Sequence, residues 1–218
     1  MSPRSFLLDD VLNAYVVDHT VPIDGVLARI TERTAALGDP AGMQIGPDQA
    51  ALLTMLTRFA RVSSAVEVGT FTGTSALCIA RGLAPGGRLL CCDVSEEWTA
   101  IAREGWVEAG VDDRIDLVVA PAADTLAALP AEATIDLAFV DADKTGYLTY
   151  YEELVPRLRP GGWLVADNTL WGGSVVDPAA TDEATEAIRA YNDRAAADER
   201  VDTVVLALAD GLTVSQKR

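Results

Sequence analysis

Residues 64–93, SAVEVGTFTGTSALCIARGLAPGGRLLCCD, decide the fold of this chain. The run 64–68 has the length and apolar character of a buried strand, residues 73–83 have a helical pattern, and the run 88–92 is again apolar. A strand, a helix and a second strand in close succession indicate a βαβ unit, in which the helix crosses between two parallel strands. We therefore predict an α/β fold built on a parallel sheet.

The same alternation continues toward the C-terminus. Further strands are predicted at 114–119, 135–140 and 162–166, so helices should cover both faces of the sheet. The end of the chain differs, because residues 201–218 contain Asp210-Gly211, a dipeptide typical of β-hairpins. One antiparallel strand should therefore join the parallel ones. The intervening helices are predicted at 96–109, 122–129, 147–158 and 179–197.

The N-terminal part, residues 1–62, has a helical rather than an alternating pattern. Pro47 is expected in the first turn of a helix whose apolar side chains include Leu52, Leu53 and Leu56. A chain of 218 residues fits one structural domain overall, and no repeat or low-complexity linker divides it.

The charge of the chain excludes several classes of partner. With 33 acidic and 17 basic residues, the net charge is −16. Such a field repels nucleic acid and anionic membrane surfaces but attracts cations. No segment has the apolar length of a membrane span, and the N-terminus lacks a signal-peptide core. We expect a soluble protein.

The cysteine pattern points to a reducing compartment. Cys91 and Cys92 are neighbours on a predicted strand, so their side chains should face opposite sides of the sheet. No disulfide framework is present, which favours the cytoplasm. Cys78 is expected to be a small core residue, and His19, the one histidine, a surface or core residue far from any site.

Acidic residues follow four of the predicted strands. Glu67, Asp93 and Asp141 each lie at the end of a strand, and Asp167-Asn168 ends the fifth. A single acid after a strand is usually a helix cap. Because ligands of open α/β sheets bind at the carboxyl ends of the strands, the four acids together favour a ligand site.

The first two turns favour one nucleoside cofactor over another. Gly69 and Gly73 have G-x-x-x-G spacing rather than the dinucleotide pattern G-x-G-x-x-G, and this loop alone fits a structural turn equally well. Glu67 would repel a pyrophosphate but attract an ammonium group, and Asp93 can accept both ribose hydroxyls. S-adenosylmethionine (SAM) meets these conditions. The alternative, an NAD-dependent dehydrogenase, does not.

Asp141, Asp167 and Asn168 offer two carboxylates and an amide oxygen. Such hard oxygen ligands suit Mg²⁺ or Ca²⁺. Three protein ligands leave coordination positions free, so a chelating substrate is expected beside the methyl donor.

From about Met43 to its C-terminus the chain resembles the cation-dependent class I O-methyltransferases, the group that includes catechol and caffeoyl-CoA O-methyltransferases. This resemblance implies a Rossmann-like sheet of seven strands, a homodimer, SAM as donor, and Mg²⁺ or another divalent cation such as Ca²⁺ or Mn²⁺. It also implies methylation of one hydroxyl of a catechol-like or other vicinal-diol molecule, including antibiotic, phenylpropanoid or flavonoid scaffolds. The motifs that carry it are EVGTFTGTS (67–75), FVDADKTGY (139–147), LRPGGWLVADNTLWGG (158–173), AIRAYN (187–192) and DGLTVSQK (210–217).

The resemblance also implies residue roles. Asp141, Asp167 and Asn168 would hold the cation, and Lys144 would be the general base that takes the acceptor proton. Trp171 would line the acceptor pocket, although a plain core tryptophan fits nearly as well. Residues 1–62 would contribute to a cap over substrate and dimer interface, and 63–218 would form the SAM-binding core. The residues implied to contact SAM are Met43, Ile45, Glu67, Gly69, Thr70, Ser75, Asp93, Ala122, Asp141 and Asp143.

Three departures from the family pattern bear on the substrate. Gly172 stands where caffeoyl-CoA enzymes have a substrate-contacting asparagine, and residues 1–40 hold only three basic side chains. Both observations disfavour a CoA thioester. Ala120 stands where glycine is usual, and we expect it to tighten the adenine pocket slightly. The loop 172–186 should face the substrate. A binding protein without catalysis is the remaining alternative, and the complete cation set with Lys144 argues against it.

Overall fold

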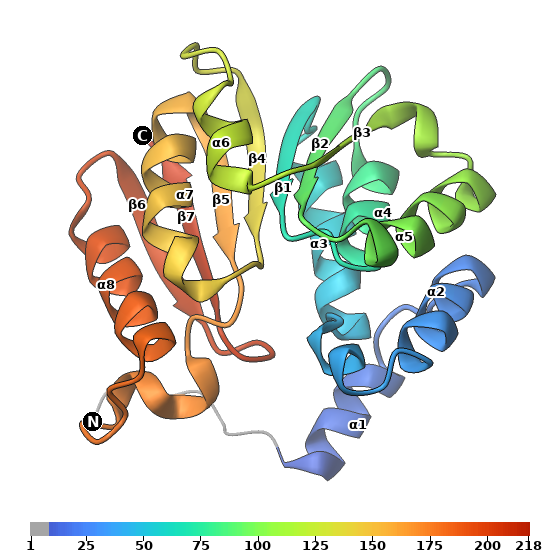
Figure 1. The fold of residues 1–218 in the computed structure, drawn as a ribbon, viewed down its shortest axis with the longest axis horizontal. Helices are drawn as coiled ribbons and strands as arrows, with labels where there is room; N and C mark the ends of the chain where they lie inside the picture. Colours follow the sequence, from blue (N-terminus) through green and yellow to red (C-terminus); the bar gives the residue numbers. More distant parts are fainter. Residues whose placement is uncertain (1–8) are drawn as a thin grey trace.

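The computed structural model in Figure 1 describes residues 9–218, and the predicted helical residues 1–8 lie outside the described part. One sheet contains seven strands in the order β3-β2-β1-β4-β5-β7-β6. Only β7 runs antiparallel to its neighbours, so the predicted mixed sheet is confirmed. The strands are β1 (Ser64–Val68), β2 (Arg88–Asp93), β3 (Ile115–Val119), β4 (Ile135–Val140), β5 (Leu158–Ala166), β6 (Val201–Leu206) and β7 (Leu212–Lys217).

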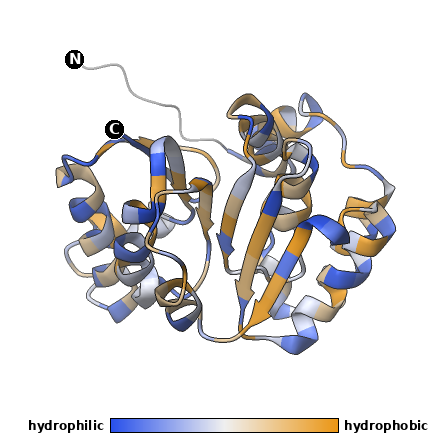
Figure 2. Cartoon of the chain, turned by 90° about the horizontal axis from the view of Figure 1, so that it is seen from above, coloured by the Kyte–Doolittle hydropathy of each residue, from blue (hydrophilic) through white to orange (hydrophobic). Residues whose placement is uncertain are grey.

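Helices cover both faces of this sheet (Figure 1). The helices are α1 (Asp10–Asp18), α2 (Gly25–Ala35), α3 (Pro47–Phe59), α4 (Thr74–Gly82), α5 (Glu96–Ala109), α6 (Ala122–Ala127), α7 (Tyr147–Leu154) and α8 (Glu183–Ala197). One apolar core lies between one face of the sheet and helices α2–α5. A second core lies between the other face and helices α6–α8. Figure 2 shows apolar residues concentrated on the strands between these layers.

Two local predictions are confirmed by this packing. Cys91 is buried in the core under α2–α5 and Cys92 in the core under α6–α8, as expected for neighbours on one strand. Pro47 is the first residue of α3, where its missing N–H costs no hydrogen bond. His19 lies on the surface. Within residues 9–218 no helix is long and apolar enough to cross a membrane.

Three element boundaries differ from the prediction by four residues. α7 ends at Leu154 rather than 158, because a short helix that contains Pro156 follows it. β5 begins at Leu158 rather than 162, because the strand passes Pro160 and Gly161 through an irregularity in its register with β4. Gly161 has φ 78°, which glycine adopts without strain. α8 begins at Glu183 rather than 179, because the Asp182 side chain accepts from the Thr185 N–H at 3.0 Å and caps the helix.

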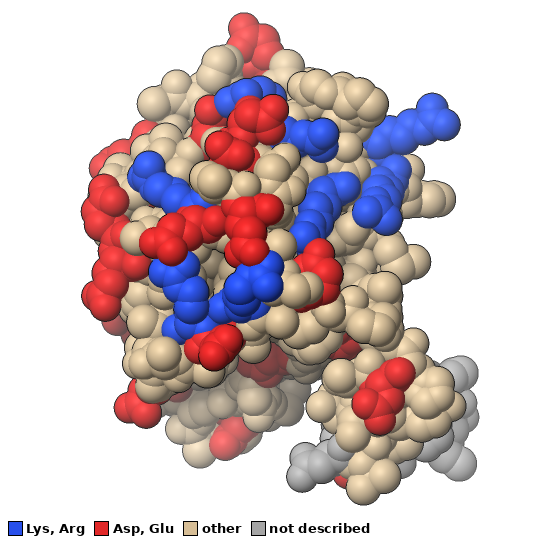
Figure 3. Space-filling model, turned by 90° about the vertical axis from the view of Figure 1, so that its right-hand side faces the viewer, with Lys and Arg blue, Asp and Glu red and all other residues tan. Residues whose placement is uncertain are grey.

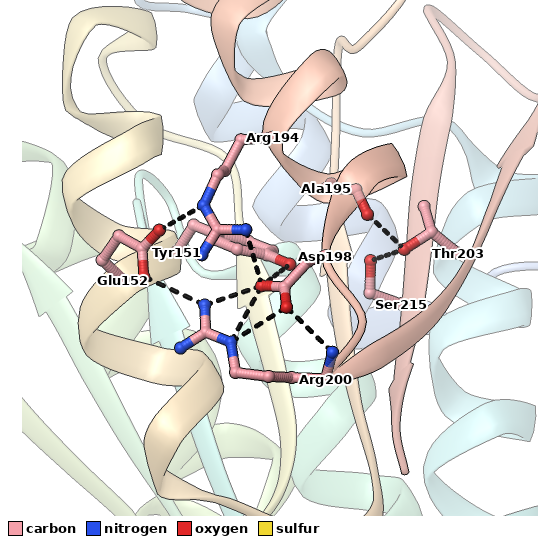
Figure 4. A network of polar contacts seen from close by, with 8 residues as sticks. All are labelled: Tyr151, Glu152, Arg194, Ala195, Asp198, Arg200, Thr203 and Ser215. Carbon is pink, nitrogen blue, oxygen red and sulfur yellow. Dashed lines mark hydrogen bonds and ion pairs between the residues drawn. The ribbon is translucent and has the colours of Figure 1, made fainter.

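A charged network joins α7, α8 and β6 (Figure 4). The buried Asp198 carboxylate accepts from Arg200 at 2.6 Å and from the Tyr151 hydroxyl at 3.0 Å. Arg194 of α8 and Arg200 both contact Glu152 of α7, at 2.6 and 3.0 Å. The hydrogen bond from Arg200 holds the pKa of Asp198 well below its usual range. This network anchors the helix that follows Lys144.

Charges are also paired on the face that carries α2 and α5, where acidic and basic side chains alternate (Figure 3). Arg29 and Arg33 of α2 form ion pairs with Glu108 and Glu104 of α5. These pairs are exposed, so each stabilises the fold only slightly. They link α2 to α5 on the outside of the fold.

Candidate active site

A cavity of about 890 Å³ opens at the carboxyl ends of β1, β2, β4 and β5. The predicted site residues converge on it from segments far apart in the sequence, with the exception of Glu67. The predicted residues that line it are Met43, Ile45, Gly69, Thr70, Ser75, Asp93, Ala122, Asp141, Asp143, Lys144, Asp167, Asn168 and Trp171.

The turn after β1 lies against neighbouring backbone. Gly69 has φ 90°, and a Cβ on it would lie 1.9 Å from the Asp141 carbonyl oxygen, so only glycine fits here. Asp93 Oδ2 accepts from the N–H groups of Thr70 and Phe71 at 2.9 and 2.7 Å. Asp93 therefore shapes this turn, besides its predicted contact with a ribose. That second function was not evident from the sequence.

Glu67 lies behind the cavity wall rather than on it. Its side chain is fully buried, the Cys91 thiol donates to Oε2 at 3.4 Å, and Oε1 has no hydrogen-bond partner among the described residues. Burial raises the pKa of this carboxyl from 4.5 to about 8. Near neutral pH this carboxyl is therefore mostly uncharged, and a cationic group bound nearby would favour its ionised form.

This burial predicts a pH-dependent stability. Between about pH 4.5 and 8 the unfolded chain releases the Glu67 proton while the folded chain keeps it, so the free energy of unfolding should fall as pH rises. Each pH unit is worth roughly 1.4 kcal/mol at most. We expect Glu67→Gln to raise the Tm of the ligand-free protein above that of the wild type by several degrees at pH 8 and by much less at pH 5. An equal difference at both pH values in thermal unfolding would contradict this assignment.

Lys144 brings two of the predicted cation ligands together. Its Nζ donates to Asn168 Oδ1 at 2.6 Å and to the Tyr147 hydroxyl at 2.8 Å, and lies 3.2 Å from Asp141 Oδ1. The Asp141 and Asn168 oxygens thus converge on a single positive charge. Lys144 begins the short helix η3 (Lys144–Gly146), which places its side chain at the cavity directly after β4.

Asp167 completes this group from the end of β5. It is buried, and burial together with the neighbouring Asp141 charge raises its pKa to about 6. Its Oδ1 accepts from the Asn168 N–H at 2.7 Å. Asn168 has φ 56°, a left-handed conformation that asparagine tolerates better than most residues. Within residues 9–218 no three His, Cys, Asp or Glu side chains are grouped to hold a metal, so a cation at this place depends on the amide oxygen of Asn168.

Gln49 is a residue of this site that the sequence analysis missed. It is 1% exposed, and its Nε2 donates to Asp167 Oδ2 at 2.7 Å from 118 positions away. A polar side chain four residues before Leu53, on the apolar face of α3, is the signal that could have identified it. Gln49 fixes the orientation of the Asp167 carboxylate.

We expect Gln49→Leu to weaken the predicted cation site. Loss of the donor leaves a buried carboxylate oxygen unpaired, which should cost about 1–3 kcal/mol of stability. Removing a residue that orients a ligand should weaken Mg²⁺ binding roughly 10- to 100-fold in calorimetry. Gln216→Leu is the control, because Gln216 lies near the C-terminal end of β7, away from the end of β5 that carries Asp167. If Gln49→Leu is destabilised but its Mg²⁺ affinity is unchanged, Gln49 contributes to packing and not to cation binding.

The other end of the cavity is formed by Trp171 and the β6–β7 hairpin. Trp171 is half-buried: it packs against the core under α6–α8, lines the cavity and has its ring centroid 5.7 Å from Lys144 Nζ. The hairpin holds the backbone on both sides of Trp171. Asp210 Oδ1 accepts from the Gly172 N–H at 2.6 Å, and the Asp210 carbonyl accepts from the Leu170 N–H at 2.9 Å. Asp210 also lines the cavity.

Known proteins are similar to this chain over nearly its whole length. A family model described as O-methyltransferase matches residues 18–218. Probable caffeoyl-CoA O-methyltransferase 2 of Dictyostelium discoideum is 38% identical over 96% of this chain and 92% of that protein. Tricin synthase 1 of Oryza sativa subsp. japonica is 37% identical over 98% of this chain and 90% of its own length.

Solved structures agree with these relatives. The O-methyltransferase from Bacillus cereus, in complex with SAH, superposes with a TM-score of 0.87 at 29% identity, covering 95% of this chain and 97% of that one. TomG from Streptomyces achromogenes, an O-methyltransferase involved in tomaymycin synthesis and solved with SAM, has a TM-score of 0.87 at 27% identity, covering 95% and 96%.

Proposed function

Because the chain belongs to the O-methyltransferase family and is a SAM-dependent enzyme, we propose that it requires a divalent cation and methylates one hydroxyl of a vicinal diol. The observation that carries the proposal is the convergence of Asp141, Asn168 and Lys144 at the cavity, with Asp167 beside them. Dehydrogenase chemistry leaves these residues without a use.

SAM is proposed to lie along the carboxyl ends of β1 and β2. Asp93 would accept the ribose hydroxyls, Ala122 would lie near the adenine, and Met43 and Ile45 near the methionine end. The support is that these residues line the same cavity. Glu67 would compensate the ammonium group from its buried position behind the cavity lining. The other proposed contacts are Gly69, Thr70, Ser75, Asp141 and Asp143.

The group around Lys144 fits a cation and a proton acceptor. Asp141, Asp167 and Asn168 present the oxygen donors that Mg²⁺, Ca²⁺ or Mn²⁺ prefer. When bound, the cation would attract both oxygens of a vicinal diol and make the hydroxyl more acidic. Lys144 Nζ, as the free amine, would take the hydroxyl proton. The oxygen would then form its bond to the SAM methyl carbon as the carbon–sulfur bond breaks, which leaves SAH.

The N-terminal helices are proposed to form part of a cap over the substrate and over a homodimer interface, with residues 63–218 as the SAM-binding core. The segment Gly42–Gly46 and Gln49 line the cavity, which supports the first of these roles. A cytoplasmic location is supported by three unpaired, buried cysteines. The relatives' names, tricin synthase and a tomaymycin-synthesis enzyme, support a secondary metabolite as the acceptor.

The test of this function is a methyl-transfer assay with labelled SAM. Catechol, its monomethyl ether and phenol should be offered in parallel with Mg²⁺ present. We expect catechol to receive one methyl group and then stop, because the product has lost the hydroxyl pair. Equal turnover of catechol and phenol would show that the diol is not recognised.

A further inference from the structure

The Tyr147 hydroxyl connects the two turns that carry the proposed base and cation ligands. It accepts from Lys144 Nζ at 2.8 Å and donates to the Asp167 backbone carbonyl at 3.0 Å. Lys144 follows β4 and Asp167 follows β5, so one hydroxyl joins the carboxyl ends of two neighbouring strands. The proposed function has so far given this hydroxyl no part in the reaction.

The ring of Tyr147 is fixed by the core around it. The side chain is 1% exposed, and its ring packs edge to face against the ring of Tyr191 in α8, with the centroids 5.6 Å apart. Tyr147 is also the first residue of α7, so its backbone belongs to a helix. Because a close-packed interior leaves such a ring little room to move, the hydroxyl offers Lys144 Nζ an acceptor at a fixed place.

The other two contacts of Lys144 Nζ are made with proposed cation ligands. Nζ donates to Asn168 Oδ1 at 2.6 Å and lies 3.2 Å from Asp141 Oδ1. Both oxygens would be shared with a bound cation, which weakens their hold on a second positive charge. Among residues 9–218, the Tyr147 hydroxyl is the hydrogen-bond partner of Nζ that has no such second task.

We propose that Tyr147 is a positioning residue, which keeps Lys144 Nζ directed at the acceptor hydroxyl while the cation ligands are occupied. This inference rests on the proposed function, in which Lys144 takes the proton. A base must lie within hydrogen-bond reach of that proton, and a displacement of about 1 Å can cost about 100-fold in rate. Tyr147 does not line the cavity, so it acts through Lys144.

Tyr147→Phe removes the hydroxyl and keeps the ring that packs against Tyr191. We expect kcat with catechol to fall about 10- to 100-fold, as for loss of a hydrogen bond to a charged group. The KM for catechol and the Kd for SAM should change by less than about 3-fold, because no group that binds either molecule is removed.

Tyr151→Phe is the matched control. Tyr151 lies one turn later in α7, is fully buried, and packs edge to face against the same Tyr191 ring with the centroids 5.7 Å apart. Its hydroxyl donates to Asp198 at 3.0 Å and not to Lys144. Tyr151→Phe should therefore keep the wild-type kcat. An equal fall of kcat in both variants would assign Tyr147 to packing and overturn the proposal.

A double-mutant cycle tests whether Tyr147 acts through Lys144. In the Lys144→Ala background, Tyr147→Phe should change the single-turnover rate by less than about 2-fold, because the group that the hydroxyl positions is gone. The same fall in both backgrounds would show that Tyr147 acts independently of the base.

A readout without turnover comes from the lysine side chains. The chain has two lysines, Lys144 and Lys217, so nitrogen-15-labelled lysine gives two Nζ signals in NMR. With Mg²⁺ and SAM present, the Nζ protons of Lys144 should exchange with water about 10- to 100-fold faster in Tyr147→Phe than in the wild type, and those of Lys217 should not change. If the wild-type Lys144 protons exchange as fast as those of Lys217, the proposal is wrong, even where Tyr147→Phe does not fold.

The outcomes separate this inference from the proposed function. If Lys144→Ala lowers the rate and Tyr147→Phe does not, the proposed function stands and the role of Tyr147 is overturned. If Lys144→Ala is as active as the wild type, both are overturned, because no base remains for Tyr147 to position.

Discussion

Lys144→Ala is expected to bind SAM normally and to transfer the methyl group about 10²- to 10⁴-fold more slowly than the wild type, as for loss of a general base. The reason is geometric. Nζ contacts Asn168 Oδ1 and lies 3.2 Å from Asp141 Oδ1, at the place where the acceptor hydroxyl is proposed to lie. Removal of the amine leaves the hydroxyl proton without an acceptor, while the residues proposed to contact SAM are unchanged.

Single-turnover kinetics and calorimetry with SAM would check this result. Raising the pH should partly restore the mutant, because hydroxide can then ionise the diol. Lys217→Ala is the control, since Lys217 is the only other lysine of the chain and lies at the end of β7. A Lys144→Ala enzyme as active as the wild type at neutral pH would show that the proton leaves by another route.

Removal of divalent cations is expected to abolish methyl transfer. EDTA should reduce activity to background, and Mg²⁺ added in excess should restore it. Asp141→Asn keeps the shape of the side chain and removes one negative charge from the proposed cation ligands. Its Mg²⁺ affinity should fall by at least about 10-fold, because a full charge next to a cation is worth more than 1.4 kcal/mol at a buried site.

Two readouts keep this prediction independent of activity alone. Mg²⁺ titration by calorimetry reports on the ligands, and the catechol assay reports on the chemistry. Asp202→Asn is the control, because Asp202 is an exposed acid that forms an ion pair with Arg218 on the far edge of the sheet. Full activity of the wild type in EDTA would show that the two carboxylates and the amide serve a purpose other than cation binding.

The architecture and the grouping of the strand-end acids could be predicted from local sequence patterns. Its alternating strand and helix patterns set the parallel core, because side-chain periodicity follows directly from local backbone geometry. Asp210-Gly211 indicated the hairpin for the same local reason. The acids at strand ends could be grouped in advance, since the carboxyl ends of parallel strands meet at one edge, and the structure brings Asp93, Asp141 and Asp167 to one cavity.

The residues that support and surround this group could not be predicted in the same way, because they come from distant parts of the chain. Gln49 reaches Asp167 across 118 residues, and Asp210 reaches Gly172 across 38, distances at which local periodicity carries no information. The early start of β5 at Leu158 depended on its pairing with β4, which tolerates Pro160 and Gly161 at an irregular register where the isolated sequence resembles a turn. The burial of Glu67 behind the cavity lining also follows from the packing of complete elements. The same is true of Arg189 in α8, whose side chain donates to the Val175 carbonyl at 3.0 Å, because no short stretch of sequence encodes such contacts.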